Sequence, residues 1–165
     1  MRILGIDPGT ATTGFGVVDS AGQKLNFVDG GVISTPAGAP MPERLQTISQ
    51  ELIQIIAEFK PDVMSVELLY FATNVTTAMS VGQARGVVLL AAAEAGLEVV
   101  EFTPLQVKQA VTGYGKAAKG QVQEMVKTLL KLKELPRPDD AADALAVAIA
   151  AANSGSLNQK LAVKL

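Results

Sequence analysis

The order of its strand-like and helix-like segments constrains the fold of this chain more than any other feature. Residues 2–7, 13–19 and 24–34 form three short runs of strand-favouring residues, and Asp-Ser-Ala-Gly at residues 19–22 predicts a hairpin turn between the last two. From residue 42 onward, helix-like and strand-like runs alternate. Three antiparallel strands followed by such alternation are typical of a mixed α/β sheet.

Apolar spacing and turn residues place the later elements. Leu45, Ile48 and Leu52 share one face of a predicted helix over residues 42–59. We expect strands at 62–67 and 98–102. A further helix should begin at a cap formed by Thr76 or Thr77 and end at residue 95, and three more helices are expected at 105–111, 119–132 and 139–152. The sequence therefore predicts one domain over residues 1–152, a mixed five-stranded sheet flanked by helices, and a flexible tail over residues 153–165.

The composition removes most of the common catalytic groups. The 165-residue chain has no histidine and no cysteine, which excludes thiolate nucleophiles, disulfides, Ser-His-Asp triads and zinc sites built on Cys or His. It is 48% hydrophobic and 18% charged, which argues against disorder. The longest uncharged apolar stretch, residues 86–93, is too short to cross a membrane. An active centre must therefore use carboxylates, lysine, tyrosine, hydroxyl or backbone groups.

Several carboxylates lie at the ends of predicted strands and at the start of the last predicted helix. Asp7 and Glu67 each end a strand-like run, and Asp139, Asp140 and Asp143 open the last helix. A turn, an exposed strand end and helix capping would account for Asp7, Glu67 and Asp139 individually. Asp143 is harder to explain in this way, because it lies among closely packing apolar residues and a buried charge needs a partner.

Two pairs at this helix start could act together. Asp140 and Asp143 are three residues apart, and Asp139 and Asp143 are four apart, so either pair shares one helical face. With Asp7 and Glu67, either pair would form an all-oxygen site suited to Mg²⁺ or Mn²⁺. Two such ions about 3.5–4 Å apart can promote phosphodiester hydrolysis. Mutual repulsion would raise the carboxylate pKa values and destabilise the metal-free fold.

The charge distribution is compatible with a nucleic-acid substrate. The net charge is −2, but residues 101–137 hold seven Lys and Arg against three Glu, a local net charge of +4. Such a segment either contacts phosphates or forms a solvated helix face. Tyr70 and Phe71 follow Glu67 closely and could stack on an unpaired base, whereas burial in the core is the competing interpretation, above all for Phe71.

Two other segments have competing interpretations. The helix over residues 79–95 contains Gly82, Ala84 and Gly86, which suits either a core helix or a dimer interface. Residues 7–14 are similar to the first phosphate loop of actin-like and sugar-kinase ATPases, which predicts nucleotide binding. Those ATPases need a second such domain, and this chain has neither the length nor a second copy of the motif.

Six short motifs follow one another along residues 1–152, and together they are far more specific than any one alone. They are Gly-Ile-Asp-Pro-Gly at 5–9, Glu67 with Tyr-Phe-Ala-Thr-Asn at 70–74, Gly-Gln-Ala-Arg-Gly at 82–86, Gln-Val-Lys-Gln at 106–109, Lys-Gly-Gln-Val-Gln at 119–123, and Asp-Ala-Ala-Asp-Ala-Leu at 140–145. In these motifs and their order the chain resembles the RuvC family of Holliday-junction resolvases.

The resemblance implies a ribonuclease-H-like fold and an endonuclease that cuts two opposed strands of a four-way DNA junction, in recombination and repair. It implies 5′-phosphate and 3′-hydroxyl product ends and two Mg²⁺ or Mn²⁺ ions per active site. The catalytic and metal-binding residues that it implies are Asp7, Glu67, Asp140 and Asp143. DNA contacts are expected from Tyr70, Phe71, Asn74, Lys108, Lys116 and Lys119.

The resemblance also implies partners and a cellular location. It implies a homodimer built on the helix that contains residues 82–95, and cooperation with the RuvA–RuvB branch-migration machinery. We expect a cytoplasmic bacterial protein that does not enter the membrane.

Two positions depart from the family pattern, and the acidic composition is also unusual. Thr73 stands where a Lys commonly precedes the Asn, and Asp139 beside Asp140 leaves the choice of ligand open. The sequence pI of about 5.2 is low for a DNA-binding protein. We expect weaker or more salt-sensitive DNA binding as a result. A junction-binding module that has lost catalysis is the remaining alternative, and the presence of all four carboxylates argues against it.

Overall fold

The computed structural model describes residues 1–68 and 75–154, and within them five strands form one mixed sheet in the order β3-β2-β1-β4-β5. The strands are β1 (Arg2–Asp7), β2 (Thr12–Ala21), β3 (Lys24–Ser34), β4 (Val63–Glu67) and β5 (Glu98–Phe102). β2 pairs antiparallel with β1 and β3, whereas β4 pairs parallel with β1 and β5. The predicted mixed sheet, three antiparallel strands and then parallel ones, is confirmed.

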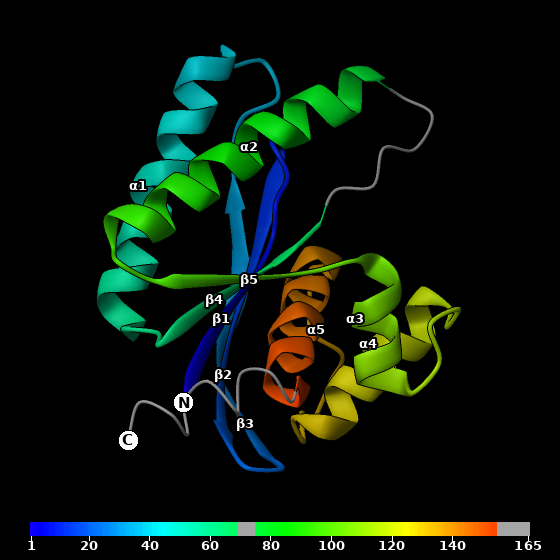
Figure 1. Cartoon of the computed structure of the whole chain (residues 1–165). Helices are drawn as coiled ribbons and strands as arrows, with labels where there is room; N and C mark the ends of the chain where they lie inside the picture. Colours follow the sequence, from blue (N-terminus) through cyan, green and yellow to red (C-terminus); the bar gives the residue numbers. More distant parts are fainter. Residues whose placement is uncertain (69–74, 155–165) are drawn as a thin grey trace.

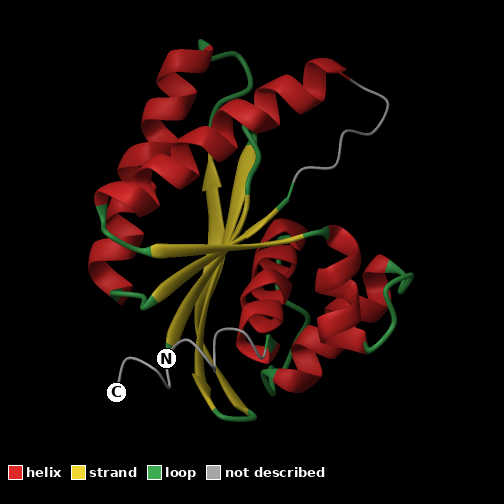
Figure 2. Ribbon diagram, viewed as in Figure 1, coloured by secondary structure: helices red, strands yellow, loops and turns green. Residues whose placement is uncertain are grey.

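Helices cover both faces of this sheet (Figure 1, Figure 2). On one face lie α1 (Met41–Phe59) and α2 (Val75–Glu94); on the other lie α3 (Pro104–Thr112), α4 (Lys119–Leu129) and α5 (Asp139–Asn153). Side chains alternate between the faces of a strand, so Leu4 and Ile6 join the core under α1 and α2, whereas Ile3 joins the core under α5. By the same alternation, Asp7 at the end of β1 faces α5.

Two predicted boundaries were wrong. β2 continues to Ala21, and the hairpin turn is made by Gly22, with φ of +63°, and Gln23 rather than by residues 19–22. Asp19 stays in the strand because its carboxylate accepts a hydrogen bond of 2.9 Å from the Arg2 guanidinium on β1. α4 ends at Leu129 rather than at residue 132, because the chain turns at Lys131, which has φ of +55°.

The other helix ends agree with the sequence within one or two residues. α2 begins at Val75, which places Thr76 and Thr77 in its first turn rather than at its cap. α5 extends one residue beyond the predicted end, to Asn153. The predicted flexible tail lies almost wholly outside the described residues and stays a prediction. No helix in the described part of the chain is long and apolar enough to cross a membrane.

Glycines in β1 and β2 let α5 lie directly on the sheet. A Cβ on Gly5 would lie 2.1 Å from the Ala144 carbonyl oxygen, and one on Gly14 would lie 2.1 Å from the Asp140 carbonyl oxygen. The Ser65 hydroxyl on β4 donates a hydrogen bond of 2.9 Å to the Val147 carbonyl. These close contacts fix the start of α5 above the ends of β1 and β4.

Candidate active site

Asp7 ends β1 and enters a loop whose shape is fixed by hydrogen bonds. The Thr13 hydroxyl donates to the Gly9 carbonyl over 2.7 Å, and the Thr35 hydroxyl donates to the Thr10 carbonyl. A Cβ on Gly9 would lie 2.3 Å from a carbonyl oxygen of the same loop, so a side chain does not fit there. The loop therefore turns sharply and leaves the Asp7 carboxylate at the edge of the sheet.

Glu67 ends the neighbouring parallel strand at the same edge. The register pairs Ile6 with Val66, so Asp7 and Glu67 occupy the next position on adjacent strands and face α5 together. Asp140 and Asp143 come from the first turns of α5, above this edge. The structure thus places near one another the four carboxylates that the family resemblance implies, and Asp7 is repelled by the other three.

The pKa of Asp7 reports how close these charges are. The pKa of Asp7 is raised from 3.8 to about 7; burial is the largest cause, repulsion from Glu67, Asp143 and Asp140 adds to it, and Lys119 opposes the rise. Burial likewise raises the pKa of Glu67, with Asp143 as the next cause. Because each carboxylate disfavours the charge of its neighbours, the group favours a bound cation.

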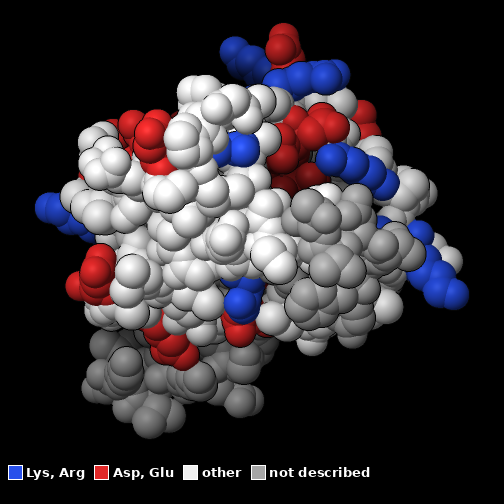
Figure 3. All heavy atoms as spheres, turned by 90° about the horizontal axis from the view of Figure 1, so that it is seen from above, with Lys and Arg blue, Asp and Glu red and all other residues white. Residues whose placement is uncertain are grey.

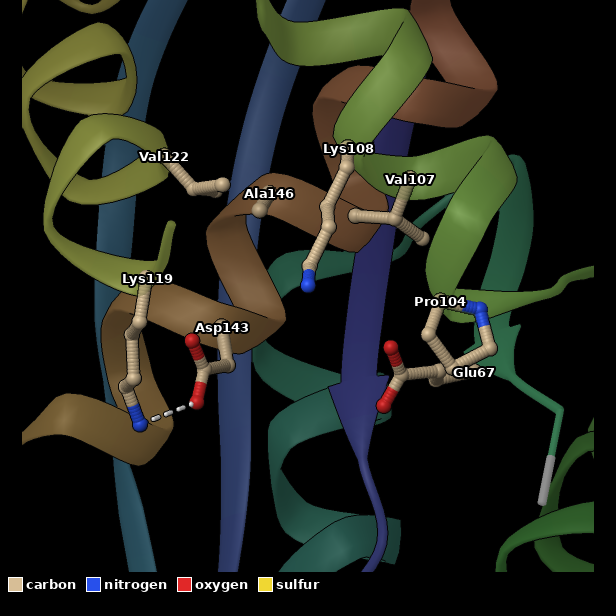
Figure 4. Close-up of a pocket in the computed structure, with 8 residues that line it drawn as sticks. All are labelled: Glu67, Pro104, Val107, Lys108, Lys119, Val122, Asp143 and Ala146. Atoms are coloured by element: carbon tan, nitrogen blue, oxygen red, sulfur yellow. Dashed lines mark hydrogen bonds and ion pairs between the residues drawn. The ribbon is translucent and has the colours of Figure 1, made fainter. Parts of the chain in front are cut away.

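Two lysines enter the same site from α3 and α4. The Lys119 ammonium donates a hydrogen bond of 2.9 Å to Asp143 and lies 3.5 Å from Asp139. This hydrogen bond to Asp143 is the main cause of the raised pKa of Lys119. Figure 4 shows Lys108 pointing into the cavity between Asp143 and Glu67. Both lysines were predicted from the sequence as DNA contacts, and their placement beside the carboxylates suits contact with a phosphate.

Two of the carboxylates, Glu67 and Asp143, and both lysines line an open cavity of about 220 Å³. Seen from above, acidic side chains gather around a hollow with basic side chains on its borders (Figure 3). Its lining combines charged and apolar side chains: Glu67, Pro104, Val107, Lys108, Lys119, Val122, Asp143 and Ala146. The apolar wall was not nominated from the sequence, because the apolar stripes of α3 and α4 indicate core packing equally well.

The donor set fits a hard divalent cation. Within residues 1–68 and 75–154, no group of three or more carboxylates is arranged so that it could hold a metal ion. The Asp143 carboxylate is instead paired with the Lys119 ammonium. The chemistry of the site is nevertheless all carboxylate oxygen, which Mg²⁺ and Mn²⁺ prefer. A cation near Asp143 would take over the role that the Lys119 ammonium has here, which would free Lys119 for another anion.

The structure distinguishes the two candidate aspartates of α5. Asp140 is half-buried, touches Gly14 of β2 and contributes to the raised pKa of Asp7. Asp139 is exposed, with 54% of its side chain accessible, and faces Lys119. The geometry therefore favours Asp140 as the residue that acts with Asp7.

The other predicted DNA contacts are not among the described residues that line the cavity. Tyr70, Phe71 and Asn74 lie outside the described residues, so their roles stay predictions. Lys116 is exposed on the loop between α3 and α4, outside the lining of the cavity.

Comparison with known proteins gives a match over most of the chain. The family model for the crossover junction endodeoxyribonuclease RuvC matches residues 3–151. The chain belongs to the RuvC family. The match includes all four clustered carboxylates and both lysines of the cavity. This membership disfavours the ATPase interpretation of residues 7–14, since the same turn carries the aspartate of the carboxylate cluster.

Relatives and solved structures agree with the family assignment. The chain is 60% identical to RuvC of Brevibacillus brevis over 149 residues, 90% of each chain, and 52% identical to RuvC of Alkaliphilus oremlandii over 99% of this chain and 100% of the relative. It is 40% identical to Thermus thermophilus RuvC, whose structure gives a TM-score of 0.88 over 96% and 97% of the two chains. The same protein in complex with a Holliday junction substrate gives a TM-score of 0.90 over 96% of both chains.

Proposed function

We propose that this protein is a divalent-metal-dependent endonuclease that resolves four-way DNA junctions. The observation that carries the proposal is the grouping of four carboxylates at the sheet edge, beside an open cavity that Glu67, Asp143 and two lysines line. Membership of the RuvC family supports it, as does the likeness to a RuvC solved with a Holliday junction. In the cell this activity would serve recombination and repair in the bacterial cytoplasm, together with a RuvA–RuvB-type branch-migration machinery.

Each side chain has a role that its position supports. Asp7, Glu67, Asp140 and Asp143 would hold two Mg²⁺ or Mn²⁺ ions. Bound ions would supply activation of the attacking water and neutralisation of charge on the phosphate. Lys108 and Lys119 would bind the scissile phosphate and counter the negative charge that develops on it. In-line attack of water on this phosphate, with cleavage of the bond to the 3′ oxygen and protonation of that leaving oxygen, would leave 5′-phosphate and 3′-hydroxyl ends.

A cleavage assay with matched substrates tests the proposal. A synthetic four-way junction and a linear duplex with the same arm sequence are incubated with the protein in Mg²⁺, Mn²⁺ or EDTA. We expect cleavage of the junction alone, dependent on the metal, with products that DNA ligase can rejoin because their ends carry a 5′-phosphate and a 3′-hydroxyl. Equal cleavage of both substrates, or cleavage that continues in EDTA, would disprove the proposal.

Substituting the two adjacent aspartates separates their roles. We expect Asp140→Asn to slow junction cleavage by about 100-fold or more, since it removes a group that acts with Asp7. Asp139→Asn should slow it by less than about tenfold, because an exposed ion pair with Lys119 contributes little. Single-turnover rates at saturating protein measure both variants side by side. The reverse order of effects would assign the ligand role to Asp139.

The outward face of α2 supports the expected homodimer. Met79 and Leu90 expose 66% and 56% of their surfaces, and a Cβ on Gly82 or Gly86 would meet nothing within 4 Å. These four positions lie three or four residues apart, so they form one small-residue and apolar stripe along the helix. We propose that a second copy covers this stripe. An isologous dimer would present two equivalent sites to the two-fold symmetric junction.

A charge on this stripe tests the dimer. We expect Leu90→Glu to make the protein monomeric, because a carboxylate would be buried without a partner at the interface. Sedimentation equilibrium measures the association state, and a supercoiled cruciform plasmid reports paired cuts as linear product and single cuts as nicked circles. Leu105→Glu on α3, where 59% of the leucine is exposed, is the matched control and should leave the dimer intact. A dimeric Leu90→Glu variant would place the interface elsewhere.

A further inference from the structure

A second groove lies beside the active-site cavity, on the other side of the start of α4. It has a volume of about 470 Å³, within the range of pockets that take small organic groups. Its lining is formed by the end of α3, the following loop and the outer side of α4: Thr112, Tyr114, Ala117, Gly120, Gln121, Glu124 and Met125. The catalytic roles proposed above use none of these residues.

Tyr114 is the most exposed aromatic side chain in the described part of the chain, at 60%. Its backbone is nevertheless firmly held. The Tyr114 amide donates to the Thr112 hydroxyl over 3.1 Å, and its carbonyl accepts hydrogen bonds from that hydroxyl and from the Ala117 amide. Gly115 packs against Leu105, which leaves only 3.0 Å for an added Cβ. An exposed ring on a fixed loop is suited to stack on a flat partner without further ordering.

The groove and the active-site cavity are separate, but both are lined by the start of α4. Lys119 lines the cavity and the next residue, Gly120, lines the groove. Lys119 comes five positions after Tyr114, so their Cα atoms are at most about 18 Å apart. With a rise of about 3.4 Å per nucleotide along a strand, this reach covers about five nucleotides.

Charge and polarity at the groove also suit a DNA strand. Lys116 is exposed on the same loop as Tyr114, and Lys119 stands at the side toward the carboxylates, so phosphates on either side of a base could meet a lysine. Gln121 and Glu124 also line the groove; the Gln121 side-chain oxygen accepts a hydrogen bond from the Ala118 amide, so it is the Gln121 NH₂ group and the Glu124 carboxylate that can hydrogen-bond to a base edge. An aromatic ring between basic residues is the arrangement with which proteins hold unpaired bases.

We propose that this groove is a nucleobase subsite, in which an unpaired base of the junction strand, within about five nucleotides of the cleaved phosphate, stacks on Tyr114. The subsite rests on the proposed junction-resolving function and extends it, since it would help to place the strand over the carboxylates. The sequence carried a signal for it, an aromatic residue between two glycines at positions 113–115.

Binding of fluorescent junctions in EDTA tests this subsite without cleavage. Junctions carry 2-aminopurine at single positions within five nucleotides of the cut, and both its emission and the Kd are measured. We expect the wild-type protein to change the emission at one or two positions. Tyr114→Ala should abolish that change and weaken binding about tenfold. Tyr114→Phe should preserve both, because it keeps the ring.

The control removes an exposed aromatic elsewhere. Phe27 on β3 is 40% exposed and lies toward the hairpin end of the sheet, away from the carboxylates, so Phe27→Ala should change neither signal. If wild type binds the junction and Tyr114→Ala leaves both the emission and the Kd unchanged, the subsite is disproved while the proposed function stands. If wild type neither binds nor cuts the junction, the proposed function fails and the subsite with it.

Discussion

Asp7→Asn is expected to abolish junction cleavage and, at the same time, to stabilise the metal-free protein above pH 7. Asp7 contributes a carboxylate at the centre of the cluster, and the loss of several kcal/mol of transition-state stabilisation corresponds to about 10³-fold or more in rate. The stability gain has the same origin as the rate loss. A buried carboxylate among three others is costly when no cation is bound.

The direction of the pH dependence follows from the raised pKa of Asp7. The unfolded chain loses this proton near 3.8, whereas the folded protein keeps it up to about 7. Between these values the folded state binds more protons, so the free energy of unfolding falls as pH rises, and the favourable contribution is lost above about 7. The difference between the pKa of Asp7 in the unfolded and in the folded chain corresponds to a change of at most about 4 kcal/mol in the free energy of unfolding. Asn at this position carries no charge and removes that dependence.

Thermal unfolding in EDTA at pH 5 and pH 8 measures the effect. Wild type should lose stability between the two pH values, Asp7→Asn should lose less, and Mg²⁺ at pH 8 should stabilise wild type more than the variant. Asp19→Asn is a control of opposite sign, because the hydrogen bond from Arg2 lowers the pKa of Asp19. Its replacement should destabilise the protein at pH 8 by no more than about 0.5 kcal/mol, since the pair is exposed. Equal pH dependence in wild type and Asp7→Asn would contradict the electrostatic account.

The sequence predicted the sheet and the candidate ligands because both depend on local patterns. A strand that ends in a carboxylate, as at Asp7 and Glu67, can be recognised from apolar runs and turn residues. The period of two then places both side chains on one face once the strands are adjacent. The order of the motifs supplied that adjacency through the family resemblance. Local pattern alone left Asp139 and Asp140 equivalent, and only their burial and contacts separate them.

Contacts between distant segments could not be predicted from local patterns. Gly5 and Gly14 appear in the sequence as ordinary strand glycines. In the structure, a backbone carbonyl oxygen of α5 occupies the space that a side chain at either position would need. The predicted end of α4 was wrong because the apolar pattern of the sequence continues past the turn at Lys131, whose backbone adopts a left-handed conformation. Tyr114 was overlooked because exposure of a loop residue is decided by how α3 and α4 pack together.

Gly14→Ala is expected to slow junction cleavage by about 100-fold while the protein still folds. The new Cβ would lie 2.1 Å from the Asp140 carbonyl oxygen and 2.6 Å from its carbonyl carbon. These are backbone atoms, so no side-chain rotation relieves the contact, and the start of α5 must move away from β2. A displacement of about 1 Å at catalytic groups costs about 10²-fold. Strain of this kind destabilises a core by about 1–3 kcal/mol.

The measurement compares the cleavage rate and the unfolding midpoint of Gly14→Ala with those of Gly38→Ala. Gly38 lies in the loop before α1, where an added Cβ meets nothing within 4 Å, so its replacement should leave both properties nearly unchanged. Assays run well below the midpoint keep Gly14→Ala folded, so a slow rate reports the position of α5 rather than unfolding. A folded Gly14→Ala variant with the wild-type rate would show that the site tolerates movement of Asp140, and that the close packing of α5 on β2 serves stability alone.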